Sequence, residues 1–181
     1  MKKIMIIAAV AFTAAVVRAA SIGWSYAGMA GYSGDAYSLF VIGQNNVTDI
    51  NTVTDILASG GDVSAYAFAS GSVAANGSAI KMATAADAPK LDAGSYTSFF
   101  VLFDASAPTS GSSKYLVVSG LAKQNLTVGA TAASATFAVG SIASQVSGGT
   151  WKSYGESVPE PTSGLLLLLG MAGLALKRKV A

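Results

Sequence analysis

The sequence contains no cysteine and no histidine among its 181 residues, and only 11% of its residues are charged. Without cysteine the chain forms no disulfide, so a folded domain must be held together by the burial of apolar surface. Without histidine it lacks the commonest general base and the commonest metal ligand of proteins. These absences exclude Ser-His and Cys-His catalysis and zinc sites built from thiolates or imidazoles.

The positive charge of the chain is concentrated near its two ends. Six of the eleven basic residues lie there: Lys2, Lys3, Arg18, Lys177, Arg178 and Lys179. The stretch 20–158 has five lysines against eight acidic residues, a net charge of −3, although the whole chain has +2. A nucleic-acid partner requires a basic patch that can contact the phosphate backbone. We therefore predict no nucleic-acid partner and assign the basicity to the terminal segments.

The N-terminal segment has the organisation of a secretory signal peptide. Two lysines precede an apolar run over residues 4–17, the arrangement that the Sec translocon accepts with the basic end held in the cytoplasm. Cleavage by signal peptidase after Ala19 puts compact residues at the −3 and −1 positions, whereas cleavage after Ala20 would put Arg18 at −3. The sequence thus predicts a signal peptide at 1–19, with an uncleaved anchor as the alternative.

The C-terminal segment, 158–181, has three parts. They are a Val158-Pro159-Glu160-Pro161 tetrad, an apolar run over 165–176, and a basic cluster of Lys177, Arg178 and Lys179. The prolines resist helix formation and predict an extended tether. A helix over 162–176 would cover only about 22 Å, short of the roughly 30 Å hydrocarbon core of a bilayer. Because a basic cluster stays in the cytoplasm, this segment is predicted to stop translocation.

This arrangement resembles the PEP-CTERM sorting signal of Gram-negative bacteria, in which an integral-membrane exosortase recognises and processes the tail. The resemblance implies an exosortase partner and a location in the cell envelope, at the outer surface or outside the cell. The precursor would be held in the inner membrane by its C-terminal helix, at least transiently. Because PEP-CTERM proteins are associated with exopolysaccharide-producing bacteria, it also implies a role in the extracellular matrix or biofilm. A permanent single-span anchor is the alternative.

Between these segments, residues 20–157 are predicted to form the mature, β-rich domain. Strand patterns occur at 22–26, 37–42, 63–68, 96–103, 114–118, 126–128, 135–139 and 150–154. The run 96–103 has the strongest strand pattern and is predicted to pair with 114–118 as a hairpin. The sequence predicts a mainly β fold, an antiparallel sandwich or barrel-like sheet. An N-terminal signal helix and a C-terminal hydrophobic helix would flank it.

One segment, 47–58, has helical periodicity. The residues that share its apolar face are Ile50, Val53, Ile56 and Leu57. Thr48 is the expected N-cap, Asp49 complements the helix dipole, and the pair at 60–61 provides a C-terminal stop. We predict an amphipathic helix packed against the sheet, and a weaker helical turn at 84–88.

No motif for catalysis or cofactor binding is recognisable in the domain. Ser78 and Lys81 match S-x-x-K but lack the supporting elements of serine–lysine acylases. The acidic and amide groups of 49–55 lack the full ligand set of a calcium loop. Seven aromatic residues are assigned mostly to the core, with stacking of surface Tyr and Trp on sugar rings as the alternative: Trp24, Tyr26, Tyr37, Phe40, Phe99, Phe100 and Phe103. We predict a non-enzymatic structural or binding role without cofactor or metal; the alternative is a polysaccharide hydrolase that uses aspartates.

Overall fold

The structure, a computed structural model, describes residues 22–81, 91–129 and 134–155. The predicted signal peptide, the predicted helical turn at 84–88 and the sorting tail lie outside the described residues. The elements follow in the order β1 (Ile22–Ala27), η1 (Ala30–Tyr32), β2 (Ala36–Val41), α1 (Ile50–Ala58), η2 (Ser64–Tyr66), β3 (Ala69–Ser72), β4 (Ala79–Lys81), β5 (Gly94–Phe103), β6 (Lys114–Val118), η3 (Ala122–Gln124), β7 (Asn125–Val128), β8 (Ala135–Ser141), α2 (Ala143–Gly148) and β9 (Lys152–Ser153).

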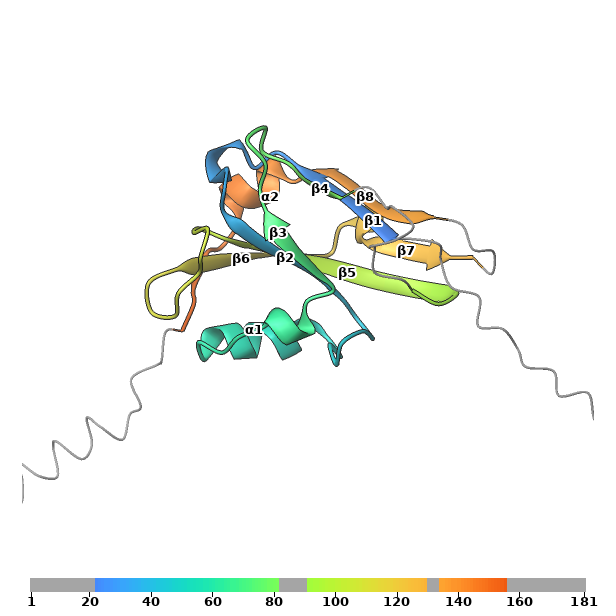
Figure 1. The fold of residues 1–181 in the computed structure, drawn as a ribbon, viewed down its shortest axis with the longest axis horizontal. Helices are drawn as coiled ribbons and strands as arrows, with labels where there is room; N and C mark the ends of the chain where they lie inside the picture. Colours follow the sequence, from blue (N-terminus) through green and yellow to red (C-terminus); the bar gives the residue numbers. More distant parts are fainter. Residues whose placement is uncertain (1–21, 82–90, 130–133, 156–181) are drawn as a thin grey trace, which may run out of the picture.

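The strands form two layers, as Figure 1 shows. The large sheet has the order β3-β2-β5-β6-β9, and β7 also pairs with β5. The small sheet has the order β4-β1-β8. The mainly β prediction is confirmed, and the predicted hairpin of β5 with β6 is present.

Of the two predicted architectures, sandwich or barrel-like sheet, the described strands form two packed sheets and no closed barrel. One detail differs from the prediction: strand β1 pairs with β8 in parallel, whereas the other described strand pairs are antiparallel. A parallel pair requires a long connection between its strands; here β8 returns to β1 after the chain has formed every strand of the large sheet except β9. Such a pairing depends on residues far apart in the sequence, which a local pattern does not record.

The central strands of the large sheet, β2, β5 and β6, are covered on both faces (Figure 1). Helix α1 covers one face, while the small sheet and α2 cover the other. Strand β5 shows the consequence, since Phe99 and Val101 pack in the cluster beneath α1 whereas Phe100 and Leu102 pack toward the small sheet. A strand buried on both faces needs apolar residues at successive positions. The continuous apolar run of β5 therefore reflects its central place in the fold.

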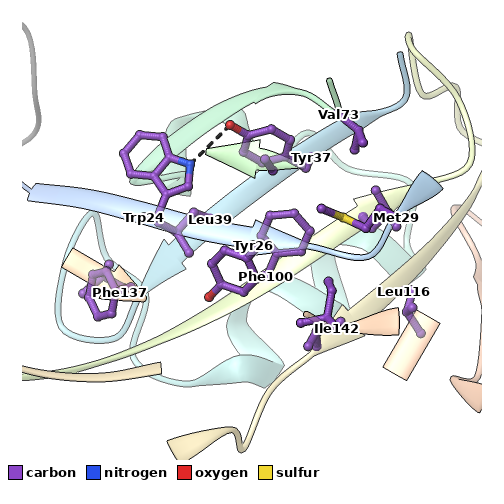
Figure 2. Packing of buried hydrophobic residues seen from close by; sticks show 14 of the residues in the cluster. Trp24, Tyr26, Met29, Tyr37, Leu39, Val73, Phe100, Leu116, Phe137 and Ile142 are labelled. Atoms are coloured by element: carbon purple, nitrogen blue, oxygen red, sulfur yellow. Dashed lines mark hydrogen bonds between the residues drawn. The ribbon is translucent and has the colours of Figure 1, made fainter. Parts of the chain in front are cut away.

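Aromatic side chains fill the space between the two sheets (Figure 2). The ring of Tyr26 stacks on Phe100 with centroids 4.5 Å apart, and Tyr37 stacks on the same ring at 5.1 Å. The indole N–H of Trp24 donates to the hydroxyl of Tyr37 across 3.2 Å. The aromatic residues assigned to the core are all buried: Trp24, Tyr26, Tyr37, Phe40, Phe99, Phe100 and Phe103.

The predicted amphipathic helix is present as α1, with one correction at its cap. Asp49, and not Thr48, is the N-cap: its carboxylate accepts the N–H of Thr52 at 2.9 Å, and Thr52 Oγ1 accepts the N–H of Asp49. This reciprocal capping box satisfies two backbone donors of the first turn. Val53 and Leu57 are buried on the face toward the sheet, as predicted.

Four further segments differ from the prediction. Residues 63–68 contain the 3-10 turn η2 (Ser64–Tyr66) rather than a strand, and β3 begins only at Ala69. The carboxylate of Asp62 accepts both the N–H and the hydroxyl of Ser64, which starts a turn at this point. Strand β9 has two residues instead of the predicted 150–154. Helix α2 and strand β4 were not predicted.

Candidate functional site

The site residues predicted from the sequence belong to the two export signals and lie outside the described residues. They are Ala19, Ala20, Val158, Pro159, Glu160, Pro161, Lys177, Arg178 and Lys179. Their roles in cleavage, sorting and membrane insertion remain predictions. The structure does describe the chain up to Gly155, with three residues between Gly155 and Pro159. The point where the tail leaves the domain is therefore known.

Strand β9 and Tyr154 attach this end of the chain to the large sheet. Strand β9 pairs with β6, and the N–H of Tyr154 donates to the carbonyl of Ser113 at 2.9 Å. The carbonyl of Tyr154 accepts the N–H of Gly111 at 2.6 Å. Its ring packs against Phe103, and its hydroxyl donates to the carbonyl of Gly61 at 3.2 Å. Backbone and side chain of Tyr154 are thus both held by the domain.

Gly155 makes a close backbone contact with the end of α1. Its N–H donates to the carbonyl of Leu57 at 2.9 Å, and its φ of +75° lies in the left-handed region. A Cβ at this position would overlap Ser110 Oγ and lie 3.1 Å from the Cα of Gly60. Only glycine fits both the conformation and the space without strain. We call the contacts of Tyr154 and Gly155 the C-terminal anchor.

A groove of about 480 Å³ lies at the edge of the large sheet between α1 and α2. Its hydrogen-bonding side chains include Asn51 and Thr54 from α1, Gln145 from α2, Ser119 after β6 and Lys152 from β9. Within the described lining, Lys152 is the charged residue. Amide and hydroxyl groups both donate and accept hydrogen bonds, so this lining suits a polar ligand rich in hydroxyl groups.

Two aspartates have shifted pKa values with different causes. Partial burial, and then the negative charge of Asp104, raise the pKa of Asp35 above its usual value. Hydrogen bonds from the backbone and hydroxyl of Ser64 lower the pKa of Asp62. The carboxylate of Asp104 accepts the N–H of Lys114 at 2.6 Å. Over 22–81, 91–129 and 134–155, no three acidic residues gather into a group that could hold a metal ion.

The motifs weighed and rejected in the sequence have structural roles. The hydroxyl of Ser78 donates to the side-chain oxygen of Asn76 at 2.5 Å, within the turn that leads into β4. Lys81 is exposed on β4, opposite Trp24 of β1. Asp49 caps α1, which is the role preferred over a calcium loop. Burial raises the pKa of Tyr26, whose hydroxyl lies near the buried amide of Gln124. Each of these groups is explained by the fold.

Comparison with known proteins gives one match. The family model of the PEP-CTERM protein-sorting motif matches residues 157–179. The chain is a PEP-CTERM sorting-domain protein. No curated protein and no solved structure matches the chain.

The PEP-CTERM motif marks an exported protein that is sorted by exosortase, a membrane protease, to the cell envelope and surface. Its match begins two residues after Gly155, so the recognised tail follows the C-terminal anchor almost directly. None of the helices in the described part of the chain is long and apolar enough to span a bilayer. The predicted C-terminal membrane helix lies beyond that part and remains a prediction.

Proposed function

We propose that the mature domain is a non-enzymatic binding or structural protein of the cell surface, with a role in the exopolysaccharide matrix or biofilm. The observation that carries the proposal is the PEP-CTERM motif at 157–179, because the family is associated with exopolysaccharide-producing bacteria. The domain would be released from the membrane when exosortase processes its tail.

The groove between α1 and α2 supports a binding role. Its amide and hydroxyl side chains suit a hydroxyl-rich polymer, and its volume of about 480 Å³ is within the usual range of ligand sites. The purified protein should co-sediment with the exopolysaccharide of its own bacterium. A variant with Gln145→Ala and Lys152→Ala should lose this binding, whereas Lys123→Ala, outside the groove lining, should keep it. Wild-type protein that stays in solution would contradict the proposal.

A polysaccharide hydrolase is the second candidate, and one observation favours it. The pKa of Asp35 is raised by partial burial and by the charge of Asp104, and a raised pKa is a common property of carboxyl groups that act as general acids. Two carboxyl groups are the minimum for glycoside hydrolysis. Release of reducing ends by the wild type, lost in both Asp35→Asn and Asp104→Asn, would establish the enzyme. The non-enzymatic proposal expects no release from the wild type.

Sorting and processing are tested by cell fractionation with mass spectrometry of the mature ends. We expect an N-terminus at Ala20 and a C-terminus before Lys177. A protein that retains Lys177 in the integral membrane fraction would refute processing and establish a permanent anchor.

A further inference from the structure

The C-terminal anchor limits how far the sorting motif can move from the domain. Gly155 is fixed to Leu57, Gly60 and Ser110, and three residues separate it from Pro159. Four Cα-to-Cα steps of a fully extended chain reach about 14 Å at most. A protease that acts on the motif therefore works close to the folded domain, unless the anchor opens.

We call Gly155, where the chain leaves the described domain, the exit. The surface around it comes from two parts of the chain that are far apart in the sequence. One part is the end of α1, where Ala58 is exposed beside the carbonyl of Leu57 that holds Gly155. The other is the turn between β5 and β6, where Ser110 and Ser112 are exposed on either side of Gly111. We call Ala58, Ser110, Gly111 and Ser112 the exit surface.

A hollow of about 200 Å³ reaches the C-terminal anchor at Tyr154, although its lining does not include the residues of the exit surface. It is lined in part by Asp62, Pro108 and Tyr154, and Tyr154 itself belongs to the C-terminal anchor. A concave feature next to the start of the tail gives a protein partner a place to seat a side chain.

We propose that the exit surface docks against the membrane protease that processes the tail, so that recognition includes the folded domain as well as the motif. The inference rests on the proposed processing by exosortase. The partner is an integral-membrane protein whose active site receives the extended tail, and the short reach from Gly155 brings the exit surface against the rim of that site.

The test follows conversion of the full-length precursor to the processed form in cells that contain the protease. Ser112→Arg places a charge on the exit surface, where docking would remove water from it. An uncompensated charge at a protein contact costs enough to slow conversion about tenfold. Ser147→Arg is the matched control, because Ser147 is exposed on α2, on the opposite face of the large sheet from α1 (Figure 1). It should be converted at the wild-type rate.

A spacer variant distinguishes lost docking from other causes of slow conversion. Six Gly and Ser residues inserted between Gly155 and Glu156 add about 20 Å of reach. With the spacer, Ser112→Arg should be converted as fast as the spacer variant without the substitution, because the exit surface no longer has to meet the protease. Thermal unfolding of each variant shows whether the domain is intact.

The outcomes distinguish the two proposals. If the wild-type precursor is never converted, the proposed processing fails. If the wild type is converted and Ser112→Arg is converted equally fast, docking of the exit surface is refuted. Slow conversion of folded Ser112→Arg that the spacer does not relieve also refutes it.

Discussion

The close contact of Gly155 with Gly60 and Ser110 makes a sharp prediction for Gly155→Ala. Alanine at φ +75° is strained, which costs about 1–2 kcal/mol. Its Cβ would also overlap Ser110 Oγ, which can rotate away, and lie 3.0 Å from Ser110 Cβ and 3.1 Å from Gly60 Cα, which cannot. Crowding of this kind costs about 1–3 kcal/mol. We expect Gly155→Ala to lower the free energy of unfolding by about 2–5 kcal/mol.

The matched control is Gly43→Ala, because Gly43 has φ +85° and a methyl group added there would meet no other atom within 4 Å. It should cost about 1–2 kcal/mol, from backbone strain alone. Urea denaturation followed by tryptophan fluorescence measures both variants. With an m-value of about 2 kcal/mol per M, the midpoint of Gly155→Ala should lie about 0.5–1.5 M below that of Gly43→Ala.

A double variant with Ser110→Gly and Gly155→Ala should recover much of the difference, because it removes both Ser110 atoms near the new methyl group. The reasoning is refuted if Gly155→Ala costs no more than Gly43→Ala. In that case residue 155 would detach from Gly60 and Ser110 at little cost in free energy. The backbone amide at position 155 would then exchange with solvent at the same rate in the wild type and the variant.

Three further predictions concern the rest of the domain. Asp49→Ala should destabilise α1 and lower the free energy of unfolding by about 1 kcal/mol, while Asp49→Asn should stay near wild type in the same urea titration. Phe100→Ala should cost about 3–5 kcal/mol, because its ring stacks on both Tyr26 and Tyr37; a cost under about 1 kcal/mol would contradict the two-sheet core. Two aspartates should contribute to the pH dependence of stability with opposite signs. The folded-state pKa of Asp35 is raised, so its charged form opposes folding, and Asp35→Asn should raise the Tm at about pH 7 but not at about pH 2. The pKa of Asp62 is lowered, so Asp62→Ala should lower the Tm at about pH 7, and this loss should fade as the pH falls through the folded-state pKa toward about pH 2.

Sequence patterns located the elements whose signal is local. The run of β5 is apolar at successive positions, and α1 has its apolar residues at helical spacing, so both could be predicted from a single segment. Strand β3, with the sequence ASGS, is mostly exposed and carries no such pattern. It is a strand because β2 supplies its hydrogen-bonding partners. Helix α2 has six residues and one buried side chain, Val146, which is too little to create a period.

The same distinction applies to the candidate sites. The sorting motif is linear, because a protease that receives an extended tail reads consecutive residues, and it could be recognised from the sequence alone. The C-terminal anchor joins Tyr154 and Gly155 to the end of α1 and to the β5–β6 turn. A glycine pair such as Gly60 and Gly155 has no sequence pattern that marks a contact.

The amino-acid sequence by itself determined where this protein goes and that its domain is mainly β. Both depend on local features: consecutive residues read by membrane machinery, and apolar side chains whose spacing follows the geometry of one element. Only the tertiary structure decided that β1 and β8 run parallel, that the central strands of the large sheet are covered on both faces, and that the tail starts from a fixed point beside α1. These features arise from the packing of segments far apart in the chain, where shape and hydrogen-bond satisfaction select the partners.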